Sequence, residues 1–159
     1  MKYKNFEELP VWQAAIELAV RVYDLTARPQ FKGYYTIKDQ LERASVSVSN
    51  NIAEGFERGT TQELITFLYI SRGSSGETRS VLRLCDRLKR FADLRSEISD
   101  LISRATSISR QLRAWCDSLQ NTEIKGQRYL TEKSRLAEER RRDRDAFFKE
   151  LAEMRNKKT

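Results

Sequence analysis

Apolar residues recur every three to four positions over four long stretches of the chain, the spacing of a helix that buries one face. The first stretch begins at Pro10, which suits the first turn of a helix, and runs to about Ala27. The others span residues 37–58, 61–91 and 97–119. Because short connections join them, the pattern predicts an all-α protein, an antiparallel up-down four-helix bundle over residues 1–120.

Helix start signals support two of these boundaries. Thr36 with Asp39 resembles a capping pair and predicts that the second helix starts at Ile37. Thr60 with Glu63 forms a fuller capping box, which predicts that the third helix starts at Thr61.

The first helix has more apolar surface than a bundle of one chain needs. Its apolar residues cover well over roughly 200° of the helical wheel, against about 100° for an ordinary core-facing stripe. A second copy of the protein would bury the surplus, and so would the chain's own tail. The residues of this apolar surface are Val11, Trp12, Ala14, Ala15, Ile16, Leu18, Ala19, Val20, Val22, Tyr23 and Leu25.

The third helix carries small polar residues in the middle of its buried stripe, between Ser71 and Thr78 and with two glycines among them. Side chains of this size let a neighbouring helix come close, and we favour close packing over a ligand pocket. A phosphate-binding glycine loop is a poor interpretation, because GSSG lies inside a helix and no GK[ST] follows it.

Three separated segments resemble one known family. They are FEELPVWQAA at Phe6–Ala15, QLERASVSVSNNIAEGFERGT at Gln40–Thr60 and FLYISRGSSGE at Phe67–Glu77. Together they are similar to the bacterial four-helix-bundle S23 family, the 23S rRNA intervening-sequence proteins. This family is related to the accessory variability proteins of diversity-generating retroelements. The resemblance covers about the first 120 residues, and it implies a homopentamer that binds RNA and a reverse transcriptase.

The composition limits the kinds of partner and catalysis that the protein is expected to have. The formal charge of +7 makes a polyanion a plausible partner, although an indifferent basic surface fits equally well. The absence of histidine removes the commonest general base and metal ligand, so we expect no enzyme, cofactor or metal site. Cys85 and Cys116 sit at apolar helix positions and are expected to be buried free thiols. No apolar run is long enough to span a bilayer and no signal peptide is evident, so we expect a cytoplasmic protein.

The composition changes after Gln120. Residues 123–159 hold 12 Lys and Arg against 8 Asp and Glu, and Phe147 and Phe148 begin a short apolar stripe beyond EERRRDRD. We interpret residues 121–159 as a charged C-terminal extension that forms a helix, or alternatively as a basic arm that folds on a partner.

A row of arginines on the third helix is the main candidate site. The row spans about 27 Å at 1.5 Å per residue, and the wheel places it opposite the apolar stripe. Phosphates along a nucleic-acid strand would meet several of its guanidinium groups, whereas a merely solvated helix face is the alternative. The row, and the tail arginines that could extend it, are Arg72, Arg79, Arg83, Arg87, Arg90, Arg140, Arg141, Arg142 and Arg144.

The second helix carries a polar strip as a further candidate. It would line a subunit interface or a channel, or hold a hydrogen-bond network between helices; nucleic-acid contact is less favoured and catalysis least. The strip consists of Arg43, Ser47, Asn50, Asn51 and Glu54, and the oligomer surface of the first helix is expected at Trp12, Ile16 and Val20.

Aromatic residues gather in the loop between the first two helices, at Phe31, Tyr34 and Tyr35. Packing over the end of the bundle explains them as well as base stacking does. The sequence thus favours a non-enzymatic, homo-oligomeric accessory protein that binds RNA or RNA/DNA and a reverse transcriptase. The alternative is a protein-interaction scaffold without a nucleic-acid role.

Overall fold

The structure, a computed structural model, describes residues 3–121, 140, 144, 147 and 148. Its α-helices are α1 (Pro10–Thr26), α2 (Tyr35–Glu57), α3 (Thr61–Arg87) and α4 (Arg95–Gln120). Short 3-10 segments precede α1 and connect α1 to α2 and α3 to α4: η1 (Phe6–Glu8), η2 (Pro29–Phe31) and η3 (Lys89–Leu94). No β-strand occurs within the described residues, which confirms the predicted all-α class.

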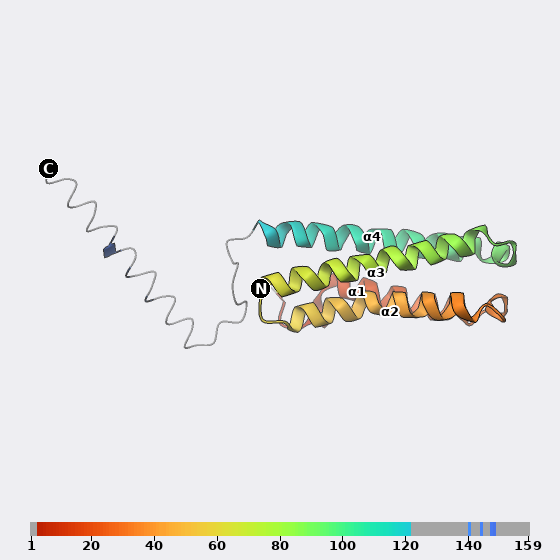
Figure 1. Ribbon diagram of the computed structural model, residues 1–159, viewed down its shortest axis with the longest axis horizontal. Helices are drawn as coiled ribbons and strands as arrows, with labels where there is room; N and C mark the ends of the chain where they lie inside the picture. Colours follow the sequence, from red (N-terminus) through yellow and green to blue (C-terminus); the bar gives the residue numbers. More distant parts are fainter. Residues whose placement is uncertain (1–2, 122–139, 141–143, 145–146, 149–159) are drawn as a thin grey trace. The chain divides into compact units, whose positions relative to one another are not determined.

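The four helices pack as an antiparallel up-down bundle (Figure 1). Each helix packs on the next along the chain, and α4 packs back on α1. The α1–α2 and α3–α4 connections lie together at one end of the bundle, and the α2–α3 connection lies at the other. The predicted architecture is therefore confirmed.

The chain divides into two compact units, Met1–Gly126 and Gln127–Thr159. The four-helix bundle lies in the first unit. Whether residues 121–159 act as a separate charged extension stays a prediction, because most of them lie outside the described residues.

Large aliphatic side chains fill the centre of the bundle, and burying each one fully stabilises the fold by about 1.5–3 kcal/mol. All four helices contribute to this core. Among its largest fully buried members are Leu18, Leu25, Leu41, Ile52, Leu64, Leu68, Leu82, Ile98 and Ile108.

Small hydroxyl residues of α3 are buried in the same core, as the sequence predicted. Ser71 Oγ donates to the carbonyl of Val48 on α2 at 2.7 Å, and Ser75 Oγ donates to the carbonyl of Ala105 on α4 at 2.8 Å. These bonds satisfy hydroxyls that would otherwise be costly to bury. They also require the backbones of both neighbouring helices to lie close to α3, so the close-packing interpretation is confirmed.

Gly55 gives α2 the same close approach to α3. A Cβ atom at this position would lie 2.6 Å from Phe67 Cβ and 3.3 Å from Leu64 Cδ1. Phe67 Cβ is anchored directly to the backbone of α3, so it cannot move aside unless the helices separate. The glycine therefore sets the distance between α2 and α3.

The helix boundaries agree with the sequence in part. Thr60 Oγ1 accepts a hydrogen bond from the backbone N–H of Glu63 at 3.2 Å, which confirms the capping box of α3. The predicted start of α2 is wrong by two residues, because the helix begins at Tyr35 and its N-cap residue, Tyr34, makes no side-chain capping bond. The expected capping partner Asp39 instead pairs with Arg43 at 3.1 Å.

The predicted end of α3 near Phe91 is also wrong. Leu88 has extended backbone angles (φ −82°, ψ 126°), which end the helix at Arg87. Phe91 is then buried at the end of the bundle, where its ring lies 4.5 Å from the ring of Phe31 and 5.4 Å from that of Tyr34. These contacts with the α1–α2 connection place Phe91 outside the helical repeat.

One side of α1 carries apolar residues that this chain does not cover. Val20 and Tyr23 are 52% and 51% exposed, and Ile16 is exposed as well. Trp12 is half-buried, with its ring 5.2 Å from that of Phe6. Part of the extra apolar surface that the sequence indicated for α1 is therefore exposed in the described residues.

We predict that Gly55→Ala destabilises the bundle by about 1–2 kcal/mol. Overpacking costs about 1–3 kcal/mol, and the better helix propensity of alanine returns only about 1 kcal/mol. Urea unfolding followed by circular dichroism measures the change. Gly73→Ala is the matched control, because nothing lies within 4 Å of its Cβ position, and it should stabilise by about 0.5–1 kcal/mol. Equal effects of the two substitutions would contradict the close approach at Gly55.

Candidate nucleic-acid interface

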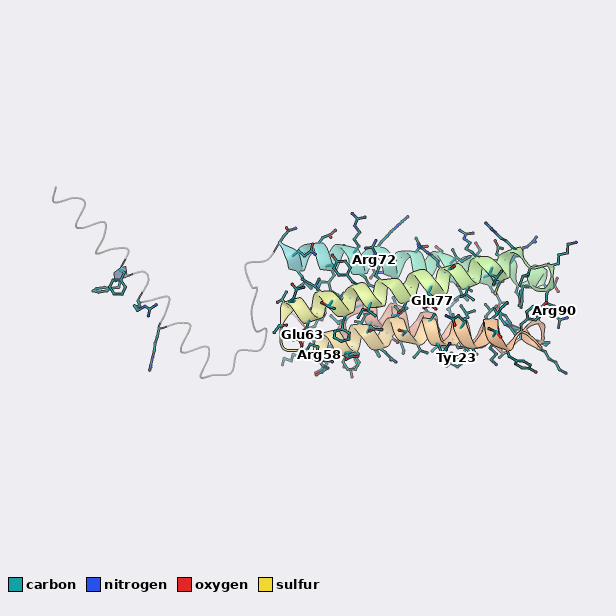
Figure 2. The ribbon with its side chains drawn as sticks, viewed as in Figure 1. Tyr23, Arg58, Glu63, Arg72, Glu77 and Arg90 are labelled. Carbon is teal, nitrogen blue, oxygen red and sulfur yellow. The ribbon has the colours of Figure 1, made fainter. Side chains whose placement is uncertain are left out.

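The arginine row of α3 lies along the border with α4. Arg79 Nη1 is 3.5 Å from Thr106 Oγ1 on α4, and both residues line a groove of about 410 Å³ between the helices. Arg72 lies close enough to Cys116 of α4 that its charge partly offsets the rise that burial causes in the pKa of that thiol. Figure 2 labels Arg72 beside α4.

The predicted position of the row, opposite the buried stripe, is therefore wrong. The stripe itself is buried as predicted, with Ser71, Ser75 and Thr78 fully buried at its centre, but the row lies beside it and not on the opposite side of the helix. Arg72 and Arg79 each follow one of these buried residues, so they leave the helix at the edge of the core and are half-buried. Arg83 and Arg87 continue the row on the same side and are exposed.

Two arginines on α4 extend this site, and the sequence reasoning missed them. Arg110 and Arg113 follow Thr106 by four and seven residues, so all three share the helix face that borders α3. The spacing is visible in the sequence, but only the packing shows which face of α4 meets α3. We call the combined set the α3–α4 arginine groove; it consists of Arg72, Arg79, Arg83, Arg87, Arg110 and Arg113.

Carboxylates neutralise this groove only in part. Asp86 pairs with Arg83 at 3.9 Å, and Asp117 pairs with Arg113 at 3.7 Å. Exposed pairs of this kind contribute at most about 1 kcal/mol and leave the guanidinium groups accessible. Within the described part of the chain, the other four arginines of the groove have no carboxylate partner. The groove is therefore a net positive surface.

Arg90, predicted to end the row, does not belong to it. It follows α3 in η3, where its guanidinium donates to the carbonyls of Gln30 at 3.1 Å and Pro29 at 3.4 Å. Figure 2 shows Arg90 at the end of the bundle where the α1–α2 and α3–α4 connections meet. These bonds hold the α1–α2 and α3–α4 connections together.

A role of the tail arginines in this site stays a prediction. Arg140 and Arg144 are exposed and helical within the second unit, and Arg141 and Arg142 lie outside the described residues. Phe147 and Phe148 of the same unit are also exposed, with their ring centroids 6.2 Å apart.

The polar strip of α2 separates into two kinds of residue. Ser47 Oγ lies 3.0 Å from Ser74 Oγ on α3, and Asn51 Nδ2 donates to the carbonyl of Ser47 at 2.7 Å, so both belong to a network between helices. Arg43 and Glu54 form surface pairs along α2, with Asp39 at 3.1 Å and Arg58 at 2.6 Å. Asn50 is exposed.

A second groove, between α1 and α4, has a different electrostatic character. It encloses about 480 Å³, and acidic and basic residues alternate along it. Arg21 bonds to Glu17 at 2.8 Å and to Asp100 at 3.3 Å, and the Glu17 bond is the main cause of its raised pKa. Arg104 also pairs with Asp100, at 2.7 Å. Four acidic residues line the α1–α4 groove against two arginines, so it is a poor site for a polyanion.

The sequence model of the 23S rRNA-intervening sequence protein family matches residues 7–114. The chain belongs to this family. The match includes all six arginines of the groove, so the site lies within the part of the chain that defines a 23S rRNA-intervening sequence protein. The predicted S23 relationship is confirmed, whereas the link to retroelement accessory proteins stays a prediction.

A solved structure has a similar fold. It is a protein of unknown function from the S23 ribosomal protein family of Bacteroides thetaiotaomicron VPI-5482. The two chains align with a TM-score of 0.59 and 22% identity, over 67% of this chain and 97% of the other. A likeness at this identity shows the fold alone. A search of curated protein sequences finds no match.

The described residues contain no group of three or more His, Cys, Asp or Glu that could hold a metal ion. Over the same residues, no helix is both long and apolar enough to cross a membrane.

Cys85 and Cys116 are buried free thiols, as predicted. Burial raises the pKa of Cys85 to about 11. Burial also raises the pKa of Cys116, and the neighbouring Asp117 adds to the increase. Since the thiolate is the reactive form, both residues are poor nucleophiles at neutral pH.

We predict that iodoacetamide labels neither cysteine in the folded protein at pH 8 and labels both in urea. A raised pKa keeps the thiol protonated until the pH approaches that value, and burial excludes the reagent. Intact-mass spectrometry counts the adducts. Labelling of folded protein at the rate of a free thiol would show that α3 and α4 open locally around Cys85 and Cys116.

Proposed function

We propose that the protein is a non-enzymatic, homo-oligomeric nucleic-acid-binding protein that holds RNA, or an RNA/DNA hybrid, along the α3–α4 arginine groove. The observation that carries this proposal is the groove itself, where arginines of two helices line one surface and four of the six have no carboxylate partner in the described structure. Guanidinium groups bind phosphate oxygens bidentately, and a polyanion supplies phosphates at regular intervals.

The dimensions of the groove fit this role. On the α3 side Arg87 lies 15 residue steps after Arg72, or about 22 Å at 1.5 Å per residue. A nucleic-acid strand places several phosphates over that length, since successive phosphates advance about 3.4 Å per strand along a duplex. Such contacts position a nucleic acid without reading its bases, so the proposal includes weak sequence specificity.

The family supports RNA as the polyanion. It is named for 23S ribosomal RNA, and its sequence model covers the whole groove. The resemblance to accessory variability proteins adds a retroelement reverse transcriptase as the protein partner to test first.

The exposed side of α1 supports self-association. Ile16, Val20 and Tyr23 form an apolar stripe at helical spacing beside the half-buried Trp12. We propose that this stripe packs on another copy of the chain, in the pentamer that the family resemblance implies. Assembly would repeat the arginine groove once per copy, so one RNA could contact several grooves and gain avidity.

A scaffold role without RNA is the second candidate. The exposed rings of Phe147 and Phe148 favour it, because adjacent exposed aromatic residues are typical of protein-interaction surfaces. In pull-downs, nuclease treatment removes partners that are held through RNA and leaves partners that are held by protein contacts.

We predict that the double variant Arg79→Gln/Arg83→Gln weakens binding to a labelled RNA hairpin by about 10- to 100-fold at low salt, because two charge-assisted contacts are lost. Its plot of log K against log salt should be shallower by about 1.5, because each lost phosphate contact removes about 0.7–0.9 from the slope. Fluorescence anisotropy between about 50 and 200 mM salt gives both values.

The matched control for this prediction is Arg21→Gln/Arg104→Gln, which removes the same amount of charge from the two arginines that pair with Asp100 of the α1–α4 groove. It should leave the slope close to that of the wild type. If the wild type shows no salt-dependent RNA binding at low salt, the proposed function is wrong. An equal loss in both double variants would assign binding to net charge and not to the α3–α4 arginine groove.

We predict that Val20→Asp dissociates the oligomer, raising its dissociation constant more than about 100-fold, because an unpaired buried carboxylate costs on the order of 3 kcal/mol or more. Val20 is 52% exposed in the single chain, so the variant should still fold. Leu84→Asp, at a residue of α3 that is 48% exposed, is the control and should assemble normally. Light scattering measures the mass, and a wild-type monomer would contradict self-association.

A further inference from the structure

The end of the bundle that holds both the α1–α2 and the α3–α4 connections forms one surface, which we call the tip and define as residues 28–38 and 87–95. Arg90 bonds to the carbonyls of Pro29 and Gln30, and the ring of Phe91 packs against those of Phe31 and Tyr34. These contacts join two segments that are far apart in the sequence.

The tip concentrates positive charge. Residues 28–38 and 87–95 contain seven Lys and Arg residues against one Asp, a net +6 in a chain whose total is +7. Arg28 pairs with Glu97 at 3.2 Å and Lys38 with Glu42 at 3.7 Å. Within the described residues, the remaining cations of the tip have no carboxylate partner: Lys32, Arg87, Lys89, Arg90 and Arg95.

The tip also continues the α3–α4 arginine groove. Arg87 belongs to both surfaces, since it is the last residue of α3 and lies one turn beyond Arg83. Lys89 follows on the connection to α4 and Arg95 is the first residue of α4, and both are exposed. A polyanion lying along the groove would therefore meet further cations where the groove reaches the end of the bundle.

One aromatic residue of the tip has no packing role. Phe31 is buried and Tyr34 half-buried, and both pack on Phe91, which settles the alternative that the sequence left open for these two. Tyr35 differs, because it is 70% exposed and its side chain makes no hydrogen bond or ring contact within the described residues. A large exposed ring on a surface that also carries cations without carboxylate partners is typical of a platform on which a nucleic-acid base stacks.

We infer that the tip binds an unpaired nucleotide of the RNA, with Tyr35 stacking on the base while Lys32, Lys89 and Arg95 hold the flanking phosphates. This inference rests on the proposed function, and it narrows the ligand to RNA with bases free of pairing, such as a hairpin loop or a single-stranded junction. A stem lies along the arginine groove, where only its phosphates are contacted. The loop reaches the tip, where a base is free to leave the stack.

The test compares two RNAs of equal length and charge, a hairpin with an unpaired loop and a blunt duplex, in anisotropy titrations at constant salt. The wild type should bind the hairpin more tightly. Tyr35→Ala should weaken hairpin binding by about 5- to 150-fold, the value of one stacked base, and leave duplex binding unchanged. Tyr35→Phe keeps the ring and should bind as the wild type does. A 2-aminopurine in the loop should lose fluorescence on binding to the wild type and not to Tyr35→Ala.

The possible outcomes separate the two proposals. If the wild type binds neither RNA, the proposed function and the tip site both fail. If it binds both RNAs in a salt-dependent manner but Tyr35→Ala binds the hairpin as tightly as the wild type does, the tip site alone is wrong. Because Tyr35 is exposed, the variant should keep the thermal stability of the wild type, and a circular dichroism melt confirms that any loss is local to binding.

Discussion

The close approach of α3 to both of its neighbours is the constraint on which the other features depend. Gly55 lets α2 come close enough that a methyl group would meet Phe67 at 2.6 Å, and Ser75 bonds directly to the backbone of α4. Because the buried face of α3 carries small side chains at its middle, the neighbouring helices come close, and the edge of that face reaches Arg72 and Arg79. Those arginines then emerge at the edge shared with α4, and helix packing thereby creates the positive groove.

The helices themselves could be predicted from the sequence, because a helix that buries one face has apolar residues at every third or fourth position. The Thr60–Glu63 cap and the buried role of Ser71 could also be read locally. The end of α3 could not, since Phe91 fits the helical repeat as well as it fits its true position. Phe91 lies outside α3 because its ring packs on those of Phe31 and Tyr34, which are about sixty residues earlier in the chain.

The candidate site was predictable only on its α3 side. The arginine spacing of one helix is visible in the sequence, but a groove needs two helices and the rotation of each about its axis. Arg110 and Arg113 could therefore be assigned to the site only once the packing of α4 on α3 was known. The distinction between Tyr34 and Tyr35 has the same origin, because two adjacent tyrosines look alike until the fold covers one and leaves the other exposed.

Two of the buried hydroxyls of α3 fix how the helices are aligned along their axes. Ser71 and Ser75 point to backbone acceptors on different helices, one on α2 and one on α4. If either neighbour slid along its axis by one turn, a hydroxyl would lose its acceptor inside a dry core, whereas leucines would tolerate the slip by repacking. These directional bonds thus fix the positions of α2, α3 and α4 along their axes. The distance between the α3–α4 arginine groove and the tip is therefore fixed as well.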